Sequence, residues 1–315
     1  MQRKFSIGIL FLGLLSTFFL FARAAEKNSK TSFEKKIGVL LVNHGSRSAT
    51  WRKSLLALEE SVRPVLSKNT AIQGIKTAFM EYTEPSIATR MKEFDAEGFT
   101  DVVIVPIFLT VSPHTFDDIP TIIGKKINPE SMEMLKIEKI ERYTPKTNTV
   151  ITPNLDFTDL LRKNVLRRVK SLTKNSKEEA LVMIAYGDET YEKEWASLLD
   201  NVGNYVRQQT GIASHSYGWC GHLVHYDPQK TTDAIVKVLA SSKKAIVIPL
   251  LVAHDEMFQV KIIGDGIANV ENNKSRVVYR PDSILPDANV EQWVINISNE
   301  YVQKIQNEEE IVSTK

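Results

Sequence analysis

Short apolar runs alternate with amphipathic stretches along most of the chain. The runs are rich in β-branched residues, which predicts strands, and the stretches between them have helical spacing. Strand–helix alternation of this kind predicts a parallel sheet covered by helices on both faces. In the first half, strands are expected at residues 38–42, 72–79, 102–106 and 135–140, and helices at 51–66, 86–97 and 121–127.

The same alternation resumes after residues 143–155, a stretch rich in Pro, Thr and Asn that reads as a linker. The second half then predicts four more strands and four more helices. The strands are expected at residues 180–185, 212–216, 245–251 and 276–279, and the helices at 157–172, 192–209, 229–240 and 290–305.

The two halves resemble each other. The segment GVLLVNHGSR aligns with ALVMIAYGDE, which sets His44 against Tyr186 and Gly45 against Gly187. Pro85 and Pro106 are 21 residues apart, and so are Pro228 and Pro249. A repeat of about 140 residues makes each unit a whole domain. The fold class expected is therefore α/β, with two similar domains, each a parallel sheet flanked by helices, facing a central cleft.

This organisation sets the expected domain boundaries. The order is a leader, a polar linker, an N-terminal domain carrying HGSR, a second linker, a diverged C-terminal domain and a polar tail. These segments are expected at residues 1–24, 25–36, 37–145, 146–155, 156–306 and 307–315.

The leader explains the small positive charge of the chain. Of 40 Lys and Arg residues, Arg3, Lys4 and Arg23 lie in the leader, so the rest of the chain has 37 basic against 38 acidic residues. A chain this close to neutrality gives no reason to expect nucleic acid binding. Hydrophobic residues make up 43% and charged residues 25%, as in a globular protein.

The leader also predicts export. Residues 1–4 are basic, residues 5–21 carry no charge, and Ala22-Arg23-Ala24 places small residues where signal peptidase acts. Cleavage after Ala24 is expected, with an uncleaved membrane anchor as the alternative. Either way the folded part is periplasmic or otherwise exported, and the membrane is a partner only if the leader stays. With the single Cys220, no intrachain disulfide can form.

Two histidines follow apolar runs at corresponding places. His44 follows VLLVN, and His114 follows IVPIFLTVSP. Ligands of parallel α/β sheets bind beyond the carboxyl ends of the strands, and neutral imidazole suits divalent transition metals. We therefore expect His44 and His114 to share a metal site, the alternative being that each only makes loop hydrogen bonds. Glu81, at the end of the second expected strand, is a candidate third ligand or proton acceptor.

The neighbours of the histidines suggest supporting roles. Ser46 and Arg47 lead into the first expected helix, where a helix N-terminus beside a guanidinium attracts a carboxylate. Asp117 and Asp118 precede Pro120, and an aspartate here is expected mainly as a helix N-cap, with a hydrogen bond to His114 as the alternative.

The second half lacks this pattern but holds other metal-binding side chains. Some of them are expected to line the shared cleft, and a second metal site is the alternative. The candidates are Cys220, His222, His225 and His254, and the alignment sets His225 against Tyr82.

Three motifs together resemble the class II tetrapyrrole metal chelatases, the sirohydrochlorin cobaltochelatase family. They are the HGSR turn, the segment Pro106–Leu109, and the later His114 with Asp118-Ile119-Pro120. The resemblance is close over residues 37–145 and continues to about 305 as a diverged copy. It implies a lyase that inserts Co²⁺, or in relatives Ni²⁺ or Fe²⁺, into sirohydrochlorin without ATP, as in cobalamin biosynthesis.

By the same resemblance, His44 and His114 hold the metal, Glu81 assists proton removal, and Ser46 and Arg47 bind the tetrapyrrole. Two other functions stay open. One is an exported protein that binds metal or tetrapyrrole without catalysis, and the other is a periplasmic solute-binding protein that closes on a small solute.

Overall fold

The computed structural model describes residues 35–109, 113–155 and 157–313 of the 315-residue chain. The expected signal peptide, residues 1–24, and most of the expected linker 25–36 lie outside this part. The described residues belong to one compact unit. Among the helices described, none is both long and apolar enough to cross a membrane.

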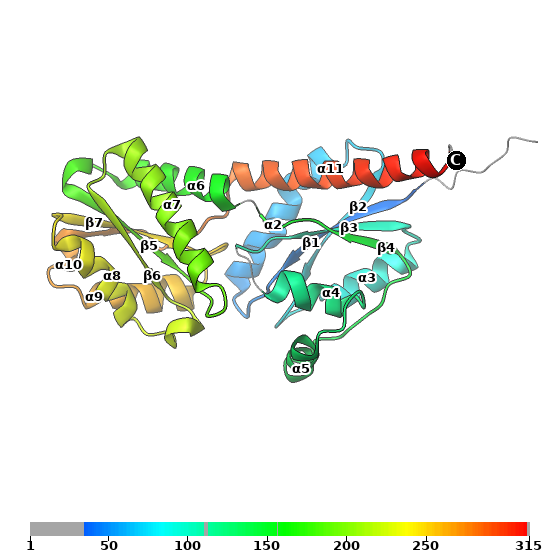
Figure 1. Ribbon diagram of the computed structural model, residues 1–315, viewed down its shortest axis with the longest axis horizontal. Coiled ribbons are helices and arrows are strands. Elements are labelled where there is room, and N and C mark those ends of the chain that lie inside the picture. The colour runs from blue at the N-terminus through cyan, green and yellow to red at the C-terminus, as the bar shows by residue number, and fades with distance from the viewer. Residues whose placement is uncertain (1–34, 110–112, 156, 314–315) are drawn as a thin grey trace, which may run out of the picture. The chain divides into compact units, whose positions relative to one another are not determined.

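Two four-stranded parallel sheets form the framework (Figure 1). Their strand orders, β2-β1-β3-β4 and β6-β5-β7-β8, are the same pattern used twice, which confirms the predicted fold class and the repeat. The strands are β1 (Ile37–Asn43), β2 (Ile72–Phe79), β3 (Asp101–Pro106), β4 (Asn148–Ile151), β5 (Glu179–Ala185), β6 (Ser214–Trp219), β7 (Lys244–Leu250) and β8 (Val277–Tyr279).

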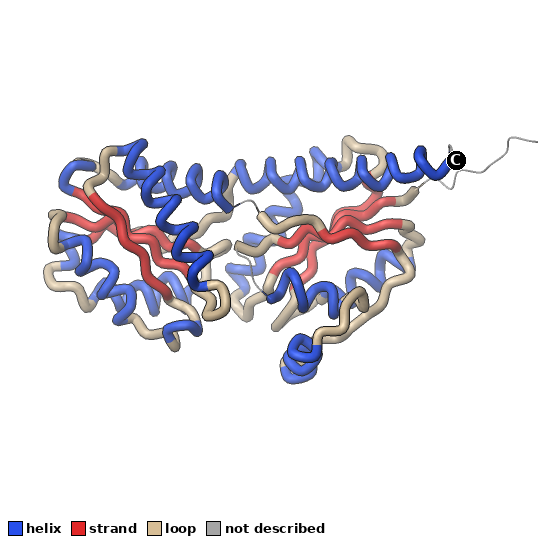
Figure 2. Tube along the Cα trace, in the orientation of Figure 1, coloured by secondary structure: helices blue, strands red, loops and turns tan. Residues whose placement is uncertain are grey.

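Helices cover both faces of each sheet, as the tube in Figure 2 shows. Continuous apolar runs such as β1 and β5, in which every residue is buried, are what a sheet covered on two faces requires. The helices are α2 (Ala49–Leu66), α3 (Ile87–Ala96), α4 (Ile119–Ile122), α5 (Pro129–Ile137), α6 (Phe157–Leu172), α7 (Glu192–Thr210), α8 (Gln229–Leu239), α9 (Ile263–Ala268), α10 (Asn273–Arg276) and α11 (Ala288–Ser313). Shorter turns are η1 (His114–Asp118), η2 (Ser176–Glu178), η3 (His222–Val224) and η4 (Glu256–Ile262).

The last helix of each repeat packs on the other sheet. Helix α6 follows β4 but contacts α7 and β7, whereas α11 follows β8 but contacts α2 and β3. One apolar core is therefore shared by the two halves, and it contains Leu58 of α2, Val165 of α6, Val202 of α7 and Val294 of α11. The opposite face of each sheet has a separate core, under α3 and α4 in one half and under α8 and α9 in the other.

Three expected segments differ in the structure. Residues 135–140, expected as a strand, contain no strand: 135–137 end α5, which Asn128 starts by accepting a hydrogen bond from the Ser131 backbone N–H, and 138–140 are a turn and loop. The expected linker 146–155 contains β4, which pairs with β3. The expected polar tail 307–315 is largely helical, because α11 continues to Ser313.

Candidate metal centre

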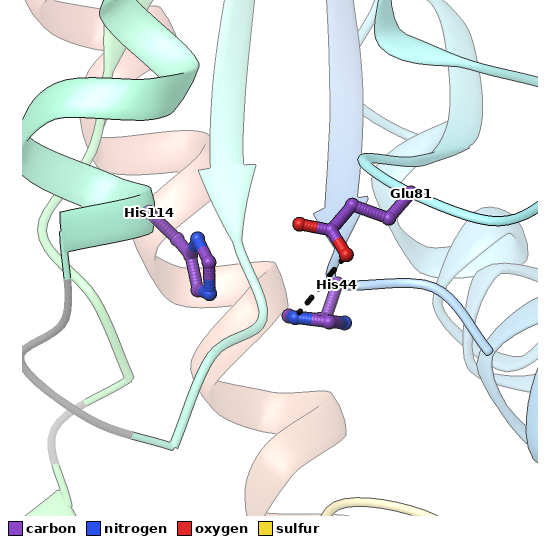
Figure 3. Close-up of side chains that lie close together, drawn as sticks. All are labelled: His44, Glu81 and His114. Atoms are coloured by element: carbon purple, nitrogen blue, oxygen red, sulfur yellow. Dashed lines mark ion pairs between the residues drawn. The ribbon is translucent and has the colours of Figure 1, made fainter. Parts of the chain in front are cut away.

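Parallel strands bring the predicted ligands to one edge of the first sheet. His44 follows β1, Glu81 lies just beyond β2, and His114 begins η1 after β3. Since β1 lies between β2 and β3 with all three parallel, their carboxyl ends meet. Figure 3 shows the two imidazoles and the carboxylate converging from these separate elements.

The three side chains are close enough to bind one ion. One ligand atom from each of His44, Glu81 and His114 lies within 4.8 Å of the others. His44 Nε2 is 4.0 Å from Glu81 Oε2, and the two imidazole centroids are 4.9 Å apart with the rings inclined at 75°. Ligands of one transition-metal ion, each bound at about 2 Å, are separated by roughly 3–4 Å. The predicted site residues are thus brought together with little adjustment needed.

The turn after β1 fixes His44 relative to Glu81. The Glu81 backbone N–H donates to the His44 carbonyl over 2.8 Å. Gly45 has φ +103°, and a Cβ at this position would lie 2.1 Å from the Glu81 carbonyl oxygen. Only glycine permits this approach, so the backbone of the HGSR turn is fitted to the end of β2.

Both imidazoles donate a hydrogen bond from Nδ1, which leaves Nε2 of each free to bind a metal. His44 Nδ1 donates to the Gly45 carbonyl at 3.2 Å, and His114 Nδ1 donates to Asp118 Oδ2 at 2.7 Å. Burial lowers the pKa of His44, and the neighbouring His114 lowers it further. The His44 imidazole is therefore held in the neutral form that a metal requires.

Asp118 supports His114 and does not cap a helix. Its backbone is helical and its side chain makes no capping bond, because η1 runs directly into α4, so the expected N-cap role is wrong. Burial by itself would raise the pKa of Asp118, but hydrogen bonds from His114 and Ser131 outweigh it and lower the pKa. The ionised carboxylate fixes the ring and makes His114 a stronger ligand.

Ser46 and Arg47 take different positions. The Ser46 hydroxyl donates to Asp255 Oδ2 over 2.9 Å, which joins the HGSR turn to the second half. The guanidinium carbon of Arg47 lies 5.0 Å from the ring centroid of Tyr82. Ser48 caps α2 by accepting from the Trp51 backbone N–H.

A cavity of about 480 Å³ joins the two halves in front of the metal ligands. His44, His114 and Arg47 line it from one half, and Tyr186 and His222 from the other. Arg47 is the one Lys or Arg among the described residues that line it. The cavity confirms the cleft that the repeat predicted.

The second half does not form a metal site of its own in the described part of the chain. Among the described residues, His44, Glu81 and His114 are the one group of three or more His, Cys, Asp or Glu whose ligand atoms are close enough to hold one metal ion. Cys220 is fully buried, and burial raises the pKa of its thiol. His254 Nδ1 donates to the Pro281 carbonyl, away from His222, which lines the cavity.

The structure also corrects the alignment of the repeats. Cys220 and Gly221 donate to the carbonyls of Ala185 and Tyr186, just as Met80 and Glu81 donate to those of Asn43 and His44. Gly221 therefore corresponds to Glu81 and His222 to Tyr82, so His225 does not. The loop from β6 to Pro228 is longer than that from β2 to Pro85, which shifted the alignment.

Solved structures share this architecture. SirB from Bacillus subtilis with Fe³⁺ superposes over 86% of this chain and 98% of its own, with a TM-score of 0.62 and 16% identity. CbiX, the terminal enzyme of sirohaem biosynthesis in denitrifying bacteria, covers 84% of this chain and 98% of its own, with a TM-score of 0.52 and 14% identity. The fold is that of the two-domain chelatases.

Sequence similarity identifies the family. The CbiX family model matches residues 38–172. The sirohydrochlorin cobaltochelatase of Methanococcoides burtonii is 34% identical over 99 residues, 31% of this chain and 71% of that protein. That of Methanothermobacter thermautotrophicus is 33% identical over 97 residues, 31% of this chain and 64% of that protein. This chain belongs to the CbiX family of class II tetrapyrrole chelatases, as its motifs predicted.

Proposed function

We propose that this protein inserts a divalent metal ion into a sirohydrochlorin-type tetrapyrrole, with Co²⁺ as the preferred ion and Ni²⁺ or Fe²⁺ as the other candidates. The cluster of His44, Glu81 and His114, in which the two histidines line the cavity, carries the proposal. Relatives named as cobaltochelatases support Co²⁺. A sirohydrochlorin ferrochelatase of Arabidopsis thaliana, 36% identical over 85 residues, keeps iron as an alternative.

Metal capture is assigned to the two imidazoles. With each Nδ1 engaged as a donor, each Nε2 presents a lone pair to the cavity. Two neutral nitrogens and one carboxylate form a site that binds divalent ions of this series but leaves coordination positions open. Macrocycle nitrogens would first bind at the open positions and would then replace the protein ligands one by one.

Proton removal is assigned to Glu81. When a divalent ion bonds to the four ring nitrogens, two pyrrole N–H protons must leave, so the charge of the macrocycle is unchanged. The Glu81 carboxylate, 4.0 Å from His44 Nε2, is in position to accept a proton as the metal passes to the ring. Insertion exchanges two pyrrole protons for one divalent ion, so the step balances in atoms and charge without ATP.

Arg47 is proposed to bind a substrate carboxylate at the cavity wall. It is a charge-assisted donor placed beside the metal ligands. We propose no such contact for Ser46, since its hydroxyl already donates to Asp255. We also propose that the protein acts outside the cytoplasm, which the signal-peptide features of residues 1–24 support.

The test is direct. Purified protein is mixed with metal-free sirohydrochlorin and Co²⁺ in the absence of ATP, and the absorbance spectrum of the macrocycle is followed against a protein-free control. We expect repeated turnover by the wild type at a rate well above the control. Tight binding of metal and macrocycle in stoichiometric amounts, with no insertion, would overturn the enzymatic proposal in favour of a binding protein.

A further inference from the structure

We propose that the C-terminal half supplies an aromatic platform, formed by Tyr186, His222, Tyr226 and Phe258, that binds the flat face of the macrocycle while the N-terminal half holds the metal. This inference rests on the proposed function and assigns the tetrapyrrole-binding role to residues that replace the metal site in the second repeat.

Register places Tyr186 of the platform at the equivalent of a metal ligand. Tyr186 follows β5 as His44 follows β1, and Gly221 stands where Glu81 stands. Met257 is eight residues past Pro249, as His114 is eight residues past Pro106. The ligand set His, Glu, His has become Tyr, Gly, Met. Neither a glycine nor a protonated phenol binds a divalent ion of this series.

The replacement at Gly221 makes room for the tyrosine ring. A Cβ at this position would lie 2.4 Å from the Tyr186 carbonyl oxygen and 2.7 Å from Tyr186 Cδ1. A glutamate here would therefore displace Tyr186. The second half has exchanged an acid for an aromatic ring, and the two cannot occupy this strand end together.

The four rings form one connected group. The Tyr186 centroid lies 5.4 Å from those of both His222 and Phe258, and the Tyr226 and Phe258 centroids are 6.2 Å apart. The hydroxyls of Tyr186 and Tyr226 are 3.5 Å apart, and His222 Nδ1 is 3.3 Å from the Tyr186 hydroxyl. These contacts set the rings relative to one another before any ligand arrives, which reduces the entropy cost of binding.

The platform is open to the cavity. All four rings line it together with His44 and His114, and Tyr226 is 42% exposed. Met257 and Tyr82, which also line it, are 48% and 49% exposed. Apolar side chains gathered around a cavity in this way are typical of a ligand site.

The charged residues that line the cavity indicate which part of the ligand enters it. Arg47 is the one Lys or Arg among its described lining residues, and Asp188 and Asp255 are also present there. Such a lining suits an extended aromatic ring system much better than many carboxylates. The macrocycle is thus inserted as a flat ring between the metal ligands and the platform, with most of its carboxylates directed to solvent.

The experiment measures macrocycle binding apart from insertion. Full-length wild type, Tyr226→Leu and Phe258→Leu are titrated with metal-free sirohydrochlorin, and Kd is read from the change in its absorbance. Loss of an aromatic pair predicts a Kd roughly 3- to 10-fold higher for each variant. Tyr226→Phe, which keeps the ring, should bind like the wild type. Tyr301→Leu, on α11 and outside the cavity lining, is the matched control for tyrosine loss.

Two results would separate the inference from the proposed function. Unchanged Kd in both leucine variants, with insertion intact in the wild type, would overturn the platform alone. Ring-dependent binding of the macrocycle in a protein that never inserts metal would overturn the enzymatic proposal and support the platform. Co²⁺ affinity and the thermal midpoint are measured for each variant, and both are expected to match the wild type. If Co²⁺ affinity falls together with macrocycle affinity, the higher Kd reflects local misfolding and the inference fails.

Discussion

The two halves of the molecule have the same backbone plan and different chemistry. Both sheets have the same strand order, and both first strands end in a turn with a glycine at positive φ, +103° at Gly45 and +83° at Gly187. One turn carries a histidine, and the other a tyrosine that belongs to an aromatic cluster. In this fold the carboxyl end of a strand can thus hold a functional site, and the side chains placed there determine what that site binds.

Glycine marks the difference between the two sites. In the first half, Gly45 lacks the Cβ that would collide with the Glu81 carbonyl, so the histidine turn and the carboxylate strand end fit together. In the second half, Gly221 has the close approach, and its neighbour is Tyr186. Each half thus needs a glycine where its first two strand ends meet, but at different positions: Gly45 follows the residue equivalent to Tyr186, whereas Gly221 is itself the equivalent of Glu81.

The largest effect is expected from removing a metal ligand of the first half. His44→Ala or His114→Ala should weaken Co²⁺ binding by more than the roughly 10- to 100-fold that loss of a supporting partner costs, because each removes a ligand atom. Insertion should be lost with it. The Co²⁺ absorption spectrum and macrocycle turnover measure the two effects.

The equivalent positions of the second half provide the contrast. Tyr186→Phe and Met257→Leu should leave Co²⁺ affinity within about two-fold of the wild type, since neither side chain is a ligand. If either variant lowered Co²⁺ affinity as much as His44→Ala, the division of labour between the halves would be wrong.

A smaller effect is expected at the partner of His114. Asp118→Asn keeps an acceptor for His114 Nδ1 but removes the charge, so Co²⁺ affinity should fall about 10-fold. Asp117→Asn is a matched control, because the Asp117 carboxylate contacts Lys126 and Asn128. Equal losses in the two variants would show that η1 responds only to a change in local charge, and that Asp118 has no special role in positioning His114.

The fold could be predicted from the sequence because a strand that is buried on both faces of its sheet is a continuous apolar run. Runs such as 102–106, buried throughout, can hardly be read as surface, and the repeat fixed the number of sheets. The short apolar run at 135–140 was ambiguous, since helix and strand periodicities are not distinguishable over so few residues. Nothing in an amphipathic pattern tells which sheet α6 or α11 will cover.

The metal ligands could be predicted for a related reason. Strand ends are visible in the sequence, so His44, Glu81 and His114 could be assigned to one sheet edge before their distances were known. The aromatic platform was missed, because its rings come from three separate segments, and the loop after β6 that supplies His222 and Tyr226 is longer than its counterpart after β2. The alignment of the repeats set Tyr186 against His44, but the spacing gave no sign that Tyr226 and Phe258 lie beside it.

The smallest expected effect concerns the scaffold, where the halves again differ. Asp95 accepts hydrogen bonds from the Tyr143 hydroxyl at 2.7 Å and from the Lys146 and Thr147 backbone N–H groups at 2.9 Å, just before β4. Burial by itself would raise the pKa of Asp95, but the bonds from Thr147, Lys146 and Tyr143 lower it to about 2. In the second half, Arg276 takes this role by donating to the Leu239 carbonyl before β8.

Asp95→Asn should therefore lower the free energy of unfolding by about 1 kcal/mol at neutral pH. Because the folded-state pKa is depressed, the carboxylate stabilises the fold above its ordinary pKa, near 3.8, and this contribution is lost as the pH falls toward 2. Arg276→Ala should cost a similar amount that does not change over this range, since a guanidinium stays charged. Thermal unfolding of both variants between about pH 7 and pH 3 tests this, and a pH-independent Asp95→Asn difference would mean that the carboxylate charge does not hold the β4 segment.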